Sequence, residues 1–256
     1  KGEISFSDEV VLGSALAKVI NKPRYNENIS LPPVDKTTIR SIIANAGNGY
    51  LSPDKVQVLL DSAGITRVKE AVVSNIEQAI VQAEKIGYPV VMKVVGPVHK
   101  SDVGGVSLNI KETNHLKDEF NRMIQIPGTN GILIQPMLDG TQIFIGAKRE
   151  PKYGHLILCG LGGIYVETIK DINYSLSPVS QIEAQTMITG LKSYPLLLGT
   201  RGQEGINIDM FNETIRRVSA LCEAAPEIFE MDINPLLGSS KQIVAVDARI
   251  RIEKEI

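Results

Sequence analysis

The sequence predicts a mixed α/β or α+β fold with two lobes. Segments with helical apolar spacing alternate with short apolar runs typical of strands along most of the chain. The length of 256 residues suits one large domain or two lobes. A hydrophobic content of 43% with 22% charged residues is ordinary for a globular protein, which excludes disorder over the whole chain.

Composition excludes several classes of function. A net charge of −2 and an aromatic content of 5% do not suit a nucleic-acid binder, which needs a basic surplus and stacking platforms. The sequence has no apolar run near the roughly 20 residues that span a bilayer, so no membrane partner is expected. Cys159 and Cys222 cannot form a disulfide scaffold or a four-ligand zinc site, and we expect two buried thiols in a cytoplasmic protein.

Residues 1–37 are interpreted as a tail or linker from an upstream domain. A short helix is predicted over residues 9–20, and residues 21–36 are polar and interrupted by prolines, as linkers are. The chain begins without methionine, so we expect a fragment of a longer polypeptide or a subunit with a tail. The globular part is predicted over residues 38–256.

Helix signals follow in order. Ser52-Pro53 opens a helix that stops at Gly64. Ser74 and Glu77 have the spacing of a capping box before a helix that ends at Gly87. Further helices are predicted over 112–124, from the capping pair at 180 and 183, and over 209–224.

Strands are predicted between these helices. Their ranges are 88–95, 106–110, 131–135, 141–148, 155–159, 228–233 and 243–247. Turns are expected at Asp139-Gly140 and around Gly238, so that the strands at 131–135 and 141–148 flank the first turn.

Lys93 lies in the middle of an apolar strand, where an unpaired ammonium is costly. Two interpretations are evenly balanced: the side chain reaches solvent from an edge, or it meets an anion. The following Gly104-Gly105 favours an anion, because paired glycines let backbone N–H groups approach phosphate oxygens. The sequence contains no GxxxxGK[ST] motif, and the glycines at 160, 162 and 163 lack GxGxxG spacing.

His99 lies in the segment between Lys93 and the paired glycines. Most histidines in loops have no chemical role, but a neutral imidazole near a bound phosphate is a competent nucleophile. His115 and His155 are expected to be structural or solvated.

Polar residues gather near the C-terminus. Glu230, Asp232 and Asn234 fall on one face of a strand, because side chains alternate with period two. Asp247 ends the next strand. Oxygen ligands of this kind suit Mg²⁺ bound together with nucleotide phosphates, although a solvated strand face is the alternative.

These residues belong to strings that occur in a known order. The strings are YPVVMK at 88–93, HKSDVGGV at 99–106, QPM at 135–137, GLGG at 160–163 with Glu167, LGTRG at 198–202 and EMDINPL at 230–236. Together they resemble the ATP-grasp domain of the ADP-forming acyl-CoA synthetases, relatives of succinyl-CoA synthetase. The resemblance covers residues 38–252, and HKSDVGGV and EMDINPL are its most specific parts.

The resemblance implies an ATP-grasp fold, in which two α+β lobes, at about 52–130 and 131–256, close on ATP or ADP. It implies that Lys93 holds the α and β phosphates under a loop with Gly104 and Gly105. Backbone around Gln135 and Met137 would read the adenine at a hinge.

The remaining implied roles concern metal and phosphoryl transfer. Asn234 and Asp247 would hold Mg²⁺. His99 would be a phosphorylatable histidine that exchanges phosphoryl with ADP and with a histidine on a CoA-binding domain or subunit, and Asp232 would steady it. Such a carboxylate would fix the ring tautomer. The complete enzyme is expected to be oligomeric.

One position departs from the family pattern, where a Gly-x-Glu sequence follows the hinge. The sequence here reads Gly140-Thr141-Gln142, so Gln142 keeps hydrogen-bonding capacity for the nucleotide but loses the charge.

Three functions are weighed. The first is the nucleotide-binding part of an acid–CoA ligase that forms ATP from acyl-CoA, ADP and phosphate. The second is a non-catalytic regulatory module of a larger protein such as an acetyltransferase; such modules typically lack the relay histidine, so His99 favours the enzyme. The third is a carboxylate–amine ligase, against which the HKSDVGGV string argues.

Overall fold

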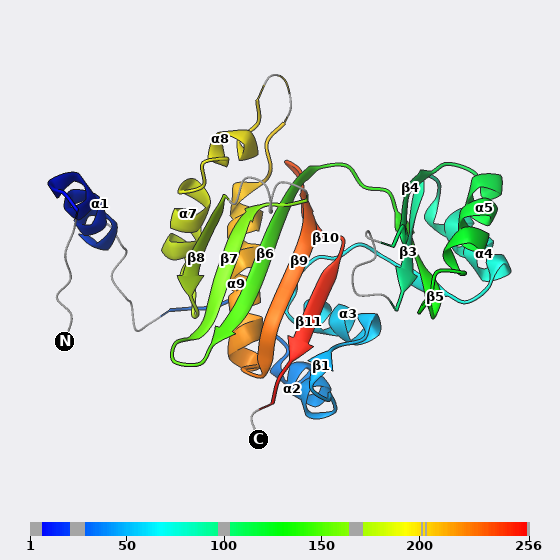
Figure 1. Cartoon of the computed structure of the whole chain (residues 1–256), viewed down its shortest axis with the longest axis horizontal. Coiled ribbons are helices and arrows are strands. Elements are labelled where there is room, and N and C mark those ends of the chain that lie inside the picture. The colour runs from blue at the N-terminus through cyan, green and yellow to red at the C-terminus, as the bar shows by residue number, and fades with distance from the viewer. Residues whose placement is uncertain are drawn as a thin grey trace.

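The computed structural model describes residues 7–20, 29–96, 103–163, 171–200, 202 and 204–254. It contains two antiparallel sheets, each covered by helices (Figure 1). Because the paired strands within these ranges are all antiparallel, the fold is α+β. No helix in these ranges is both long enough and apolar enough to span a bilayer.

The large sheet has seven strands in the order β1-β11-β9-β6-β7-β8, with β10 also pairing with β9. Its strands are β1 (Gly49–Tyr50), β6 (Thr141–Glu150), β7 (Gly154–Leu161), β8 (Ile172–Leu176), β9 (Ile228–Gly238), β10 (Ile243–Ala245) and β11 (Ala248–Ile252). The small sheet has the order β2-β5-β3-β4. Its strands are β2 (Ala71–Val73), β3 (Val90–Val95), β4 (Val106–Ile110) and β5 (Gly131–Pro136).

The helices divide between the two sheets. They are α1 (Glu9–Ile20), α2 (Lys36–Ala44), α3 (Pro53–Ser62), α4 (Ile76–Ile86), α5 (Thr113–Met123), α7 (Gln181–Thr189), α8 (Tyr194–Leu197) and α9 (Ile208–Ala224). Helices α4 and α5 pack on one face of the small sheet, where Leu116 and Ala79 are fully buried. The other packed helices belong to the large sheet.

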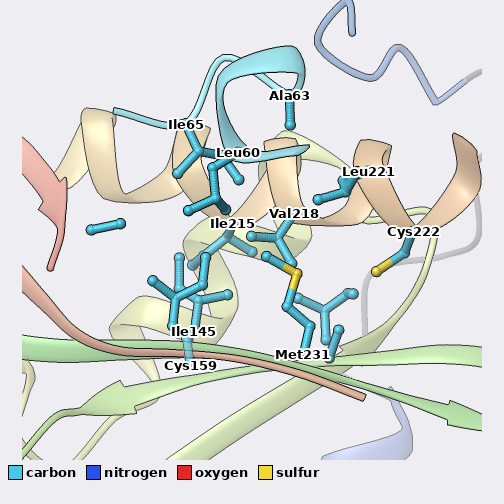
Figure 2. Close-up of a cluster of buried hydrophobic side chains, with 14 of the residues drawn as sticks. Leu60, Ala63, Ile65, Ile145, Cys159, Ile215, Val218, Leu221, Cys222 and Met231 are labelled. Carbon is cyan, nitrogen blue, oxygen red and sulfur yellow. The ribbon is translucent and has the colours of Figure 1, made fainter. Parts of the chain in front are cut away.

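The core of the large lobe forms where α9 crosses one face of the large sheet. Apolar residues of α9 recur at helical spacing, so Ile215 and Val218 face Ile145 and Met231 of the sheet (Figure 2). Leu60 of α3 belongs to the same cluster. Each such side chain contributes about 1.5–3 kcal/mol when fully buried.

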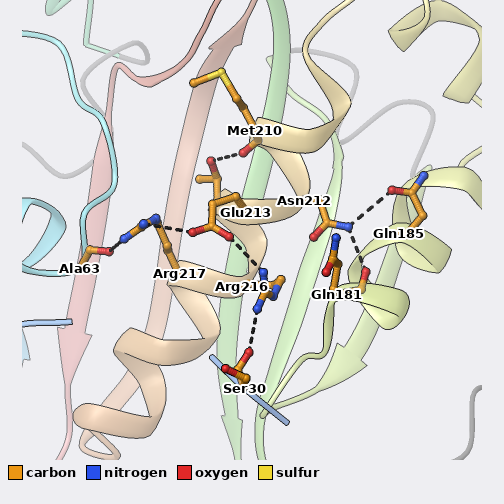
Figure 3. Close-up of polar contacts among 10 residues, drawn as sticks. Ser30, Ala63, Gln181, Gln185, Met210, Asn212, Glu213, Arg216 and Arg217 are labelled. Carbon is orange, nitrogen blue, oxygen red and sulfur yellow. Dashed lines mark hydrogen bonds and ion pairs between the residues drawn. The ribbon is translucent and has the colours of Figure 1, made fainter. Parts of the chain in front are cut away.

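The polar side of α9 holds the segments that precede the small lobe (Figure 3). Arg217 donates to the carbonyl oxygen of Ala63 at 3.0 Å, and Arg216 donates to that of Ser30 at 2.7 Å. Glu213 pairs with both arginines, at 3.1 and 3.0 Å. The globular part therefore begins near residue 30, earlier than the expected residue 38; residues 21–28 of the expected linker lie outside the described ranges.

The expected division of the lobes, at about residue 130, does not match the sheets. Strand β5 pairs on both sides within the small sheet, with β2 and β3. Helices α2 and α3 contribute Ile39 and Leu59 to the core of the large lobe. The small lobe therefore spans about residues 71–136, and the chain crosses between sheets at the expected Asp139-Gly140 turn.

Helix starts agree with the sequence at one site and differ at another. Ser180 and Glu183 form the expected capping box of α7. The expected Ser74–Glu77 box is shifted by one residue: Asn75 caps α4 by accepting from the backbone of Gln78, whose side chain accepts in return from the N–H of Ser74. An asparagine is as good an N-cap as a serine, which explains the shift.

Candidate functional site

Lys93 is buried between the two lobes. Its side chain is 6% exposed, and its Nζ donates to the carbonyl oxygen of Val246 at 2.9 Å. Val246 follows β10 in the large lobe, so the ammonium turns from the small sheet toward the large one. Its burial excludes the interpretation in which the side chain reaches solvent from an edge, and the interpretation in which it meets an anion stays a prediction.

Strand register defines which side chains accompany Lys93. In the small sheet Lys93 lies opposite Leu133, and Val91 lies opposite Gln135. Residues at odd positions of β3 and β5 therefore share the face that α4 and α5 leave open, because neighbours such as Met92 pack under those helices. This face, and not the helical one, is turned to the large lobe.

A carboxyl that sequence analysis did not identify lies beside Lys93. Glu70 accepts from Nε2 of Gln57 at 2.7 Å. Burial raises the pKa of Glu70 above its usual value; the positive charge of Lys93 opposes this, and the negative charge of Asp247 adds to it. Glu70 and Asp247 line a small cavity of about 40 Å³ that is shared by both lobes. Glu70 precedes an edge strand of three residues, so no periodicity marks it.

The paired glycines lie one strand away from Lys93. Gly104 has a φ of +67°, which glycine adopts without strain, and its carbonyl oxygen accepts from Arg122 at 2.9 Å. The carbonyl oxygen of Gly105 accepts from the backbone of β3 at 2.8 Å. Residues 97–102 lie outside the described ranges, so His99 is not placed.

The expected hinge residues end β5. Gln135 is 1% exposed, and its Oε1 has no hydrogen-bond partner among the described residues. The N–H of Met137 donates to the carbonyl oxygen of Pro89 at 3.0 Å. Because this N–H already donates within the small lobe, other backbone groups would have to form the hydrogen bonds to the adenine base of a nucleotide.

The predicted metal ligands are brought together. The N–H of Asn234 donates to the carbonyl oxygen of Asp247 at 3.1 Å, and Oδ1 of Asn234 accepts from the N–H of Gly163 at 3.0 Å. The side chain of Gln142 lies against Gly163. The described residues hold no cluster of three His, Cys, Asp or Glu fit for a metal. An amide and a carboxylate oxygen fit Mg²⁺, which completes its coordination with water and phosphate oxygens.

Asp232 has an arginine partner that sequence analysis missed. The burial pattern of β9 places Glu230, Asp232 and Asn234 on one face, as expected, with Met231 buried on the other. Arg249 of β11 lies directly opposite Asp232 and donates to its Oδ2 at 3.3 Å. Burial raises the pKa of Asp232, and the nearby Arg249 opposes that rise. Cross-strand register, which one sequence does not reveal, creates this pair.

The other histidines and the cysteines are placed as expected: His155 and both cysteines are buried, and His115 is solvated. His155 is 4% exposed and its Nε2 lies 2.7 Å from the carbonyl oxygen of Ile228, whereas His115 is exposed on α5. Burial lowers the pKa of His155. Cys159 and Cys222 are both buried, and burial raises the pKa of Cys159 to about 12.

A family model described as an ATP-grasp domain matches residues 42–252. The β subunit of acetate–CoA ligase [ADP-forming] I from Pyrococcus furiosus is 37% identical over 217 residues, which cover 81% of this chain and 94% of the subunit. Acetate–CoA ligase [ADP-forming] I from Archaeoglobus fulgidus is 35% identical over 252 residues, 94% of this chain but 36% of that protein. The chain thus spans about a third of the longer relative and nearly all of the separate subunit.

Solved structures of an acetyl-coenzyme A synthetase are also similar to this chain. The dinucleotide-forming acetyl-coenzyme A synthetase 1 from Ca. Korarchaeum cryptofilum, in complex with coenzyme A and Ca-AMPCP, matches with a TM-score of 0.79 and 32% identity. The match covers 86% of this chain and all of that chain. Another structure of that protein holds Mg-AMPPCP, with a phosphohistidine segment pointing towards the nucleotide-binding site, at a TM-score of 0.72.

Proposed function

Because the chain belongs to the ATP-grasp domain family, we propose that it is the nucleotide-binding part of an ADP-forming acyl-CoA synthetase. The complete enzyme would convert acyl-CoA, ADP and phosphate into acid, CoA and ATP, and the reverse, through phosphohistidine. Its partner would be a CoA-binding domain or subunit, in line with the β-subunit relatives. Two buried thiols without a disulfide agree with a cytoplasmic location.

The observation that carries this proposal is the Lys93–Val246 contact between the lobes. A phosphate chain is stabilised mainly by positioned positive charge and backbone N–H groups. Lys93 supplies such a charge on the open face of the small sheet, next to Asp247. We assign to Lys93 the binding of the α and β phosphates, and to the loop with Gly104 and Gly105 the covering of them.

Asn234 and Asp247 would hold Mg²⁺ when it is bound. The ion would supply charge neutralisation to the phosphates. Gln142 would add a neutral oxygen or nitrogen contact where the family usually has a carboxylate. The proposed base site lies at the end of β5, around Gln135 and Met137.

In the proposed transfer, a ring nitrogen of His99 attacks the terminal phosphorus of ATP. The new N–P bond forms as the bond to the bridging oxygen of ADP breaks, and the reverse step forms ATP. The carboxylate of Asp232 would accept a hydrogen bond from the other ring nitrogen, which fixes the tautomer and favours the positive charge. The relay would divide one long transfer into two short ones.

The test is phosphorylation of the full chain together with its CoA-binding unit, using γ-labelled ATP and Mg²⁺. We expect acid-labile, base-stable label at His99, and its loss in His99→Ala. His115→Ala is the matched control, because His115 is exposed on α5. Peptide mapping scores any histidine of the CoA-binding unit separately. Equal labelling of the wild type and His99→Ala would favour the regulatory-module function instead.

A further inference from the structure

Two arginines of β11 lie on the same strand face but have different partners. Arg249 lies opposite Asp232 and donates to it, whereas Arg251 lies opposite Glu230 and stacks over Phe229, with its Cζ 4.7 Å from the ring centroid. Both guanidinium side chains are 38% exposed. The two positions therefore differ in partner and not in residue type, strand or exposure.

The other side of Asp232 carries no side chain. Its neighbour on β6 is Gly146. A Cβ at Gly146 would meet nothing closer than 3.5 Å, so the strand tolerates a side chain there but has none. The side chain of Asp232 is 40% exposed, and it is flanked by a guanidinium on one side and by bare backbone on the other.

The charges around Asp232 are uneven. Glu230 and Asp247 add negative charge near it, and Arg249 adds positive charge. The hydroxyl of Tyr50 donates to Glu230 at 2.5 Å, so Glu230 has a hydrogen-bond partner of its own. A charge-assisted hydrogen bond from Arg249 stabilises one orientation of the Asp232 carboxylate.

We propose that Arg249 is a positioning residue for phosphoryl transfer, which holds the Asp232 carboxylate ready to accept a hydrogen bond from the phosphorylated histidine. The inference rests on the proposed function and adds a residue to it. Arg249 acts through Asp232 and not on the nucleotide. Removing it therefore slows transfer and leaves nucleotide affinity in place.

The experiment measures two quantities in the full chain with its CoA-binding unit: the affinity for Mg·ADP, and the single-turnover rate of His99 labelling from γ-labelled ATP. We expect Arg249→Ala to slow labelling roughly three- to fivefold, the effect of losing a charged hydrogen bond between side chains that are 38% and 40% exposed. Mg·ADP affinity stays within about twofold. Arg249→Lys, which keeps the charge but not the planar fork, recovers part of the rate. Arg251→Ala is the matched control and labels within about twofold of the wild type.

A double-mutant cycle tests the route of action. If Arg249 acts through Asp232, then Arg249→Ala adds no further loss to Asp232→Asn. Additive losses, a loss equal to that of Arg251→Ala, or a parallel fall in Mg·ADP affinity would each overturn the inference. If Arg249→Ala does not fold, Arg249→Gln and Arg249→Lys give the same comparison.

The two proposals fail in different ways. A wild type that neither binds Mg·ADP nor labels His99 contradicts the proposed function and this inference with it. A wild type that labels normally, beside an Arg249→Ala variant that labels equally fast, contradicts this inference alone.

Discussion

Lys93 and Val246 join the two lobes through one hydrogen bond of 2.9 Å between residues that are 153 positions apart. The acceptor is a backbone carbonyl of the residue before Asp247, so the ammonium lies close to one of the predicted metal ligands as well as to the carboxyl of Glu70. In the proposed site, a phosphate that enters between the lobes would meet a cation already turned toward it. This arrangement would reduce the reorganisation that binding requires.

The first prediction concerns Lys93→Met, which keeps the length of the side chain and removes its charge. We expect Mg·ADP affinity to fall roughly 10-fold or more, since hydrogen bonds to charged groups contribute about 1.5–3 kcal/mol. The melting temperature should change little, because an apolar side chain is cheaper to bury than an ammonium. Calorimetric titration and thermal melts measure the two effects.

Lys148→Met is the control for Lys93→Met, because Lys148 is exposed on β6 of the large sheet. It should bind Mg·ADP as the wild type does. Equal affinities for Lys93→Met and the wild type would remove Lys93 from the proposed phosphate site.

The sequence predicted those parts of the site that depend on local pattern. The apolar run around Lys93 marked a buried strand, and period two in β9 placed Asp232 and Asn234 on one face. Glu70 and Arg249 were not predicted as parts of the site. Glu70 meets Lys93 only because the two lobes are in contact, and Arg249 meets Asp232 only because of the strand register. A single sequence carries no direct signal for either.

The helices and strands that were predicted correctly are likewise those with a clear local sequence pattern. Strand β4 has the predicted bounds, and α9 and α1 were anticipated almost residue by residue. The short elements α2, β1, β2, β8, α8 and β11 were missed. Apolar spacing predicted which face of α3 is buried, but it did not predict which sheet that face packs against. The place of α3 in the large lobe was therefore not predictable.

The second prediction concerns Gly163, whose φ of +64° disfavours any side chain. A Cβ there would overlap Oε1 of Gln142. We expect Gly163→Ala to lower Mg·ADP affinity, because the side chain of Gln142 must shift and the backbone whose N–H donates to Asn234 becomes strained. Adding Gln142→Ala removes the overlap but not the cost of the backbone conformation, which is about 1–2 kcal/mol. The double variant should therefore regain the affinity that the overlap removed, but not the affinity that the strained backbone removed.

Titration of Mg·ADP into Gly163→Ala, Gln142→Ala and the double variant measures this coupling. Additive effects would indicate that Gln142 and Gly163 act independently of each other, against the contact between them.

The third prediction restores the family carboxylate with Gln142→Glu. Gln142 lies beside Gly163, which donates to Asn234, so a new negative charge falls close to the proposed metal ligands. We expect the ratio of affinities for Mg·ADP and metal-free ADP to rise several-fold, since opposite charges attract and like charges repel. An unchanged ratio would place residue 142 outside the reach of the metal.

The fourth prediction concerns the two thiols. Burial raises the pKa of both Cys159 and Cys222, so neither forms the reactive thiolate in the native protein. A thiol-specific colour reagent should detect no reactive cysteine before denaturant is added and both of them afterwards. A native thiol that reacts at once would indicate that the α9 core opens locally.

The last prediction concerns pH and stability through Arg40 and Glu227. Arg40 of α2 donates to both carboxylate oxygens of Glu227 at 2.6 and 2.7 Å, and this hydrogen bonding is the main cause that lowers the pKa of Glu227. Because the pKa is lower in the folded state, the stabilisation is complete above the unfolded value of about 4.3 and is lost as pH falls through the folded value. Arg40 is 48% exposed, so we expect only about 0.5–1 kcal/mol. The melting temperature of Arg40→Ala should therefore lie about 1–4 °C below that of the wild type at pH 7 and converge with it near pH 3.

Lys36→Ala removes an exposed charge at the start of the same helix and is the control. Its melting temperature should show no such pH-dependent gap. A gap for Arg40→Ala that persists unchanged at acidic pH would mean that packing of the Arg40 side chain, and not its pairing with Glu227, fastens α2 to the large lobe.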